Sequence, residues 1–284
     1  MSFRYHKKFI NCFSLLYLIN ASFFCIQQVD VNLLFHRQLA VFIFFITGMS
    51  LAVISSAKEV VIGFGKNKAP FVIQETGQGL EIDIFREALA FRGHTLSIVH
   101  VDNKGLLTAL ISQRVDGVAT ARDSERRFCE VDKFIEFDNV AISLKSRNVK
   151  VGSVKDLKAY NLVAWENAYQ DLGSEFNRLF KPDAQGLLPV GYFEHRNQEA
   201  QNAMFWAGRA DLIVVDKTIF AWYKKQLSTQ YLTDQPLDTH MIFGKKTYFP
   251  ALFSDEVLCE DFRAGLENLK KVNRYQQLFE EYTN

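Results

Sequence analysis

The chain has 284 residues, of which 48% are hydrophobic, and its formal net charge is +1. This length and apolar content are enough for one large domain or for two smaller lobes, each with its own hydrophobic core. The near-neutral charge excludes the broad basic surface typical of nucleic-acid-binding proteins, and fifteen glycines and five prolines exclude fibrous and low-complexity classes.

Two apolar segments precede the globular part of the sequence, FINCFSLLYLINASFFCI at 9–26 and LAVFIFFITGMSLAVISSA at 39–57. The second follows a short basic flank and ends with Ser55 and Ala57, small residues at the positions that signal peptidases require. We therefore predict a leader over 1–57 that is cleaved after Ala57. Segment 9–26 is at the lower limit of membrane-spanning length. Two readings stay open: translation starts further along the chain, or one or both segments remain as a membrane anchor.

The four cysteines divide evenly between the leader and the remainder of the chain. Cys12 and Cys25 lie in the leader, and the three residues before Cys25 are SFF, which lack the small residue that lipoprotein signals need. Export would place Cys129 and Cys259 where a disulfide persists. The sequence leaves open whether these two are bridged or are two buried thiols.

From Glu59 to Ala121 the hydrophobic pattern alternates between strands and helices. A β-branched run at 59–64, an alternating run at 95–101 and the segment 116–121 predict strands. Amphipathic helices are expected over 79–93, where Gly93 ends the helix, and over 104–114. This β-loop-α-β-α-β order predicts an α/β lobe with a mostly parallel sheet.

The rest of the chain repeats this pattern after a charged stretch. That stretch, 122–137, predicts a turn and a short helix. Ser254, Asp255 and Glu256 predict the acidic start of the C-terminal helices. The further predicted strands are 139–146, 161–165, 187–193, 211–216 and 240–246, and the further helices are one ending near 180, 197–209, 217–226 and one or two over 254–282.

One phrase occurs twice, as QRVDGVATA at 113–121 and as GRADLIVVD at 208–216. Each copy follows a predicted helix and leads through an aspartate into an apolar strand. We interpret both as the joint between a helix and a core strand, each in its own lobe, with the strand running toward a shared cleft. The alternative is that this phrase is a common connector without functional meaning.

Four segments in this order resemble the family 3 extracellular solute-binding proteins. They are APFVIQETGQGLEIDIFREAL, ALISQRVDGVATARDSERR, WAGRADLIVVDKTIFAWY and LENLKKVNRYQQLFEEY. The chain departs from the family pattern in lacking a proline before Glu125 and in having Asn273 where a glycine is usual. The resemblance covers about 59–283. It implies an α/β fold of the type 2 periplasmic binding protein, a two-lobed clamshell with lobe 1 at 58–146 plus 244–284 and lobe 2 at 147–243.

The resemblance also implies a function. It points to an exported, periplasmic, monomeric protein that captures a small polar organic ligand, an amino acid or a related compound, for an ABC transporter with a membrane permease. No cofactor, metal or nucleic acid is expected, because the sequence has no complete phosphate-binding glycine loop and no metal-ligand spacing.

Charged and hydroxyl residues in two of these segments match positions that the family uses for its ligand. Arg126 matches the carboxylate-binding arginine of the family, and its neighbour Arg127 is the alternative because the missing proline leaves two registers open. Thr120 and Ser124 would add hydroxyl donors. Asp216 matches the lobe 2 aspartate that accepts an ammonium group, and it is also a preferred N-cap for the helix that follows.

Aromatic residues complete the predicted site. Phe71 stands where the family places a ring against the ligand. Trp165 and Tyr169 flank a loop in which the family often has a Gly-Ser/Thr pair, whereas this chain has Glu166, Asn167 and Ala168. We expect Phe71, Trp165, Asn167 and Tyr169 to contact the ligand, with packing in a core as the alternative for the aromatic rings.

Two other functions stay open. One is an enzyme on the same fold, of the lyase or dehydratase type, for which Glu166 is the suggestive acid or base. The other is a membrane-tethered ligand sensor, which requires that residues 1–57 be retained.

Overall fold

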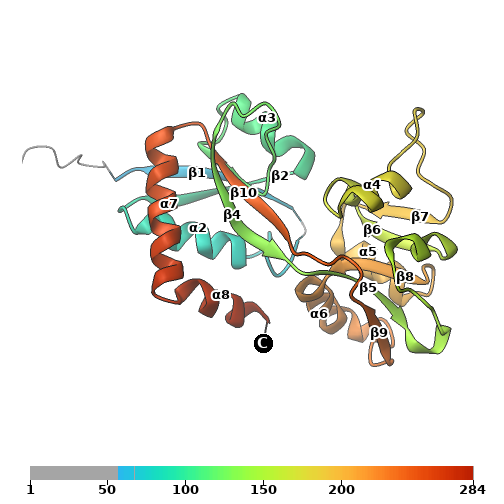
Figure 1. Cartoon of the computed structure of the whole chain (residues 1–284). Helices are drawn as coiled ribbons and strands as arrows, with labels where there is room; N and C mark the ends of the chain where they lie inside the picture. The colour runs from blue at the N-terminus through green and yellow to red at the C-terminus, as the bar shows by residue number, and fades with distance from the viewer. Residues whose placement is uncertain (1–56, 67, 284) are drawn as a thin grey trace, which may run out of the picture. The chain divides into compact units, whose positions relative to one another are not determined.

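The computed structural model describes residues 57–66 and 68–283, which belong to one compact unit of the chain. The predicted leader, with Cys12 and Cys25, lies outside the described residues except for Ala57. Within 57–66 and 68–283, no helix is both long and apolar enough to cross a membrane. Two mixed sheets flanked by helices form the described part, which confirms the predicted α/β class (Figure 1).

The first sheet has five strands in the order β2-β1-β3-β10-β4. β1 pairs in parallel with β2 and β3, and β10 is antiparallel to both β3 and β4. The bounds are β1 (Glu59–Gly65), β2 (Thr95–Val101), β3 (Gly117–Ala119), β4 (Cys129–Phe137) and β10 (Thr247–Phe253). The accompanying helices are α2 (Leu80–Ala90), α3 (Leu106–Ile111), α7 (Glu256–Lys271) and α8 (Arg274–Thr283), with α2 and α7 side by side (Figure 1).

The second sheet also has five strands, in the order β7-β6-β8-β5-β9. β6 is parallel to β7 and β8, whereas β5 is antiparallel to β8 and β9. The bounds are β5 (Asn139–Leu144), β6 (Leu162–Trp165), β7 (Tyr192–His195), β8 (Leu212–Asp216) and β9 (Leu237–His240). The helices are α4 (Ser174–Phe180), α5 (Gln198–Trp206) and α6 (Lys217–Gln226).

The chain passes between the two sheets twice, from β4 to β5 and from β9 to β10 (Figure 1). The two passages are tied together, because the side-chain amide of Asn139 donates to Thr247 Oγ1 at 3.0 Å and Thr247 pairs with Phe137. β5, which the sequence prediction assigns to lobe 1, pairs with strands of the second sheet. The exact lobe boundaries stay a prediction.

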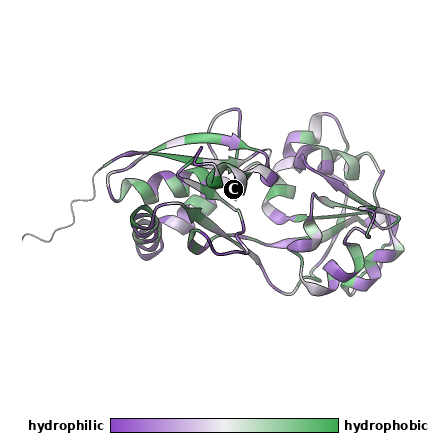
Figure 2. Cartoon of the chain, turned by 90° about the horizontal axis from the view of Figure 1, so that it is seen from above, coloured by the Kyte–Doolittle hydropathy of each residue, from purple (hydrophilic) through white to green (hydrophobic). Residues whose placement is uncertain are grey.

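Apolar side chains cover both faces of each sheet. The helices carry both hydrophobic and hydrophilic residues (Figure 2). Against the first sheet, the rings of Phe85 and Phe262 stack with centroids 4.4 Å apart. Against the second, Phe176 and Phe180 are also 4.4 Å apart. Burial of these rings is the main favourable contribution to folding.

The repeated phrase has a common structural role. Asp116 precedes β3, and its Oδ2 accepts the backbone N–H of Val61 in the parallel neighbour β1 at 2.8 Å. Asp211 precedes β8, and its Oδ2 accepts the N–H of Asn161, just before the parallel neighbour β6, at 3.0 Å. Each aspartate therefore fixes a core strand against its parallel neighbour.

Cys129 at the start of β4 and Cys259 in α7 form a disulfide. The bridge joins the edge strand of the first sheet to a helix that packs on that sheet, across a sequence separation of 130 residues. The question that the sequence leaves open is thereby answered in favour of a bridge.

Two predicted elements are wrong. The predicted short helix within 122–137 is the long strand β4, because apolar Val131, Phe134 and Ile135 are buried against the sheet although charged residues separate them. The predicted strand 240–246 is the second passage between sheets, and the strands β9 and β10 lie on either side of it. The C-terminal segment is two helices that break at Asn273, whose φ of 61° is in the left-handed region.

Candidate functional site

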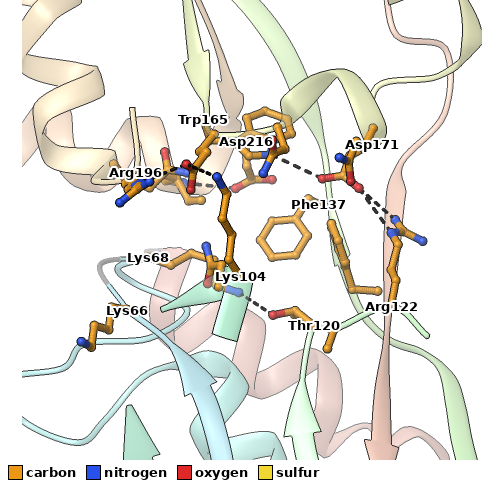
Figure 3. Close-up of a pocket in the computed structure, with 18 of the residues that line it drawn as sticks. Lys66, Lys68, Lys104, Thr120, Arg122, Phe137, Trp165, Asp171, Arg196 and Asp216 are labelled. Atoms are coloured by element: carbon orange, nitrogen blue, oxygen red, sulfur yellow. Dashed lines mark hydrogen bonds and ion pairs between the residues drawn. The ribbon is translucent and has the colours of Figure 1, made fainter. Parts of the chain in front are cut away.

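A cavity of about 430 Å³ is lined by residues from elements of both sheets (Figure 3). The repeated phrase contains β3 and β8, and both strands lead to this cavity: Thr120 directly follows β3, and Asp216 is the last residue of β8. Its charged lining residues are the cations Lys66, Lys68, Lys104, Arg122 and Arg196 and the carboxylates Glu166, Asp171 and Asp216. Its aromatic lining residues are Phe137, Trp165 and Phe249.

The wall beside the first sheet is built around Lys68. Its Nζ lies 2.6 Å from Oε1 of the fully buried Glu81 and 3.1 Å from Thr120 Oγ1, and it sits 5.5 Å from the centre of the Phe137 ring. Burial raises the pKa of Glu81 above its ordinary value, although the charge of Lys68 opposes this. Thr120 has a φ of 56°, which a β-branched residue rarely adopts. Such backbone strain is concentrated at functional sites.

Arg122 follows β3 and reaches across the cavity. Its guanidinium lies 4.6 Å from the centre of the Phe249 ring, and its Nη2 is 3.2 Å from Oδ1 of Asp171. Asp171 also accepts the indole N–H of Trp165 at 3.4 Å. Burial raises the pKa of the Asp171 carboxyl above its ordinary value, against the opposing charge of Arg122.

A second ion pair crosses the cavity. Lys104 Nζ lies 2.8 Å from Glu166 Oε1, and Arg196 Nε donates to the same oxygen at 2.9 Å. Partial burial raises the pKa of Glu166, but the hydrogen bonds and charges of Lys104 and Arg196 outweigh it, so the pKa lies below its ordinary value. Glu166 is therefore an ionised anchor for two cations.

Asp216 lines the cavity and also caps a helix. It is only 4% exposed, and its Oδ1 caps α6 by accepting the N–H groups of Thr218 and Ile219 at 2.8 and 3.1 Å. Its Oδ2 accepts the N–H of Asp138, the residue between β4 and β5, at 2.7 Å. The carboxylate thus ties α6 to the first passage between the sheets.

The stability of the protein should depend on pH through Asp216. Burial raises the pKa of this carboxyl to about 6, despite three backbone hydrogen bonds that lower it. Because the folded-state pKa exceeds the unfolded value of about 3.9, the contribution is fully present below about pH 4 and is lost as pH rises through 6. We expect the difference in unfolding free energy between the native protein and Asp216→Asn to fall by about 3 kcal/mol from pH 4 to 7 in urea titrations. A pH-independent difference would contradict the assignment.

Four of the eight predicted ligand-binding residues line the cavity: Thr120, Trp165, Asn167 and Asp216. Phe71 lies in the layer behind, where it is 1% exposed and packs against Phe137 with ring centroids 4.5 Å apart. Tyr169 donates its hydroxyl to Asn167 Oδ1 at 3.3 Å and is not among the lining residues.

Ser124 and Arg126 lie on the exposed turn between β3 and β4 and are not lining residues either. The alternative Arg127 is on the same turn, where it pairs with Asp123 and Glu125. The guanidinium that the first wall presents to the cavity is that of Arg122. Arg122 lies three residues after the end of β3, so its place in the connection that leaves a core strand was the available signal for it.

Sequence reasoning also missed five other charged lining residues: Lys66, Lys68, Lys104, Asp171 and Arg196. Lys68 and Lys104 stand in short connections after β1 and β2, and Asp171 ends the short 3-10 helix Ala168–Gln170. The carboxyl ends of parallel strands form one edge of a sheet, so the connections after β1, β2 and β3 meet there. That shared edge was the available signal for both lysines.

No protein-family model matches the chain. Over 199 residues the sequence is 25% identical to the "Putative amino-acid ABC transporter-binding protein PatH" of Vibrio harveyi. This match covers 67% of this chain and 76% of that protein. An ancestral arginine-binding protein bound to glutamine has a TM-score of 0.60 and 21% identity, and the match covers 79% of this chain and 97% of that one. AncCDT-1, an ancestral amino-acid-binding protein described as a precursor of cyclohexadienyl dehydratase, has a TM-score of 0.61 and 17% identity, over 80% of this chain and 96% of that one.

The fold is that of a type 2 periplasmic binding protein. The resemblance to family 3 solute-binding proteins that the four sequence segments indicate is confirmed by these comparisons. In this periplasmic-binding-type fold, the cavity takes its lining from the ends of β3, β6 and β8 and from the connections next to them.

Proposed function

We propose that this protein is a solute-binding protein that captures an amino acid or a related small compound for an ABC transporter. The named relatives and the fold support this assignment. The observation that carries it is the arrangement of charge in the cavity, where cations on one wall face carboxylates on the other.

An amino acid suits such a cavity because it carries both charges. A guanidinium binds a carboxylate through two parallel hydrogen bonds, and a carboxylate accepts from an ammonium group. Trp165 and Phe249 add aromatic surface that would cover the aliphatic part of the solute. The volume of about 430 Å³ is within the range of small-molecule sites.

Binding without turnover is the function that the site favours over catalysis. Glu166, the suggested acid or base, is held by Lys104 and Arg196, and its pKa lies below the ordinary value because their hydrogen bonds and charges outweigh the opposite effect of burial. A general acid must be protonated at working pH, so it needs a raised pKa. Glu166 therefore does not suit proton donation.

The proposal includes an exported, periplasmic protein that acts as a monomer and delivers its solute to a membrane permease. The Cys129–Cys259 bridge supports export, since disulfides persist in oxidising compartments. The two passages between sheets, near Asp138 and 241–246, would act as the hinge on which two lobes close around the solute.

We expect at least one free amino acid to stabilise the protein. At about one hundred times its dissociation constant it should add about 2.7 kcal/mol to the unfolding free energy, which raises Tm by about 5–10 °C for a protein of this size. A thermal-shift screen of the twenty amino acids measures this directly.

A pair of tryptophan variants is the control for that screen. Trp165→Ala removes a lining side chain and should weaken binding about tenfold, while Trp222→Ala removes a ring that packs on the core outside the cavity and should leave the affinity unchanged. If no amino acid shifts Tm, or if a bound compound is chemically converted, the proposed function is wrong.

A further inference from the structure

The ion pairs of the cavity fall into two kinds. Lys104–Glu166 and Arg122–Asp171 each join a cation near the first sheet to a carboxylate near the second (Figure 3). Lys68–Glu81 and Arg196–Glu166 instead join residues on the same side of the cavity. A solute that enters between the walls must separate the first kind and leaves the second kind in place.

Separation of the walls changes the charge balance in a specific way. Glu166 loses Lys104 but keeps the guanidinium of Arg196. Asp171 loses Arg122 and keeps the indole N–H of Trp165, which carries no charge. Two cations and one carboxylate therefore require new ionic partners: Lys104, Arg122 and Asp171.

Asp216 and Lys68 do not add to this requirement. Both oxygens of Asp216 accept backbone N–H groups, and those bonds lie within the wall. Lys68 keeps its ion pair with Glu81 in α2 and its hydrogen bond to Thr120 after β3, since both partners belong to the first sheet and its helices. The complement of two cations and one carboxylate is a molecule with two carboxylates and one ammonium group.

From this balance we infer that the solute is an acidic amino acid, an inference that rests on the proposed function and narrows it. Arg122 and Asp171 are in contact with each other and so receive the neighbouring α-carboxylate and α-ammonium groups. Lys104 receives the side-chain carboxylate. Glu166, held by Arg196, stays as the anion that keeps Lys104 pointing into the cavity.

Other classes of amino acid fit this balance less well. A basic side chain would place a second cation beside Lys104, and like charges in a partly enclosed site repel. An amino acid with a neutral side chain leaves Lys104 without an anionic partner. A dicarboxylate that has no ammonium group leaves Asp171 without a cationic partner.

Calorimetric titration of the protein with L-glutamate, L-aspartate, L-glutamine, L-arginine and succinate tests the inference. We expect glutamate or aspartate to bind at least tenfold more tightly than each of the other three. Tighter binding of glutamine, arginine or succinate would overturn the acidic assignment. If glutamine or arginine wins, the proposed function survives; if no amino acid in a full panel binds, both fall.

Variants locate the side-chain carboxylate. Lys104→Gln should weaken glutamate binding about ten- to a hundredfold and leave glutamine binding within about twofold, because only glutamate presents the second charge. Lys155→Gln removes an exposed lysine, 4.0 Å from Glu175 and outside the cavity, and should change neither affinity. Arg122→Gln should weaken both ligands. Equal losses of glutamate and glutamine binding in Lys104→Gln would overturn the role assigned to Lys104.

Discussion

Reduction of the Cys129–Cys259 disulfide is expected to lower the unfolding free energy by about 2–5 kcal/mol. The bridge closes a loop with a sequence separation of 130 residues, and in the chain-entropy account a long loop restricts the unfolded chain strongly. For a protein of this size, Tm should fall by about 2–4 °C for each kcal/mol. Calorimetry with and without a reductant measures the change.

The Cys129→Ala/Cys259→Ala double variant is the control for reduction. It should unfold at a temperature close to that of the reduced native protein, and addition of reductant should leave its Tm unchanged. Because the bridge ties β4 to α7 and is remote in sequence from the cavity residues near Trp165, solute affinity should survive in both. An oxidised native protein no more stable than the double variant would show that the bridge does not stabilise the fold.

Asp216→Ala is expected to cost about 2–4 kcal/mol of unfolding free energy at about pH 4, where the contribution of this side chain is fully present. The variant removes the N-cap of α6, worth about 1 kcal/mol, and leaves the N–H of Asp138 without its acceptor, which costs about 1–3 kcal/mol. Urea denaturation of the variant and the native protein gives the difference.

Asp255 provides a matched comparison, because it caps α7 through one hydrogen bond, from the N–H of Leu258 at 2.9 Å, and is exposed. Asp255→Ala should cost about 1 kcal/mol. The difference between the two variants measures what the tie to Asp138 adds. Equal costs would mean that this tie contributes nothing to stability.

The element order was predictable because strong local patterns agree with the tertiary structure. The strand at 59–64, the helix at 79–93 and the two copies of the repeated phrase are all found within a few residues of their predicted limits. β4 was missed because charged residues interrupt the alternation of apolar and polar side chains along it. These charged residues are tolerated because β4 lies at the edge of its sheet. Edge position depends on the strand order, which no local pattern encodes.

The site was predictable in part. Trp165 and Asp216 end strands and Thr120 directly follows one, and these strand ends contribute to the cavity lining, so strand prediction was enough to find them. The choice of Arg126 followed a motif register in a segment that lacks the proline of the family pattern. The turn carries the Arg126 side chain to the surface. Arg122 and Asp171 meet only because two sheets face each other, a relation that the sequence does not contain.

The most direct test of the account is a crystal structure of the protein with the amino acid that gives the largest thermal shift. We predict that this amino acid occupies the cavity, with its α-carboxylate within about 3 Å of the Arg122 guanidinium and its ammonium group at Asp171. A ligand bound elsewhere on the protein, with the Arg122–Asp171 pair still intact, would contradict the account.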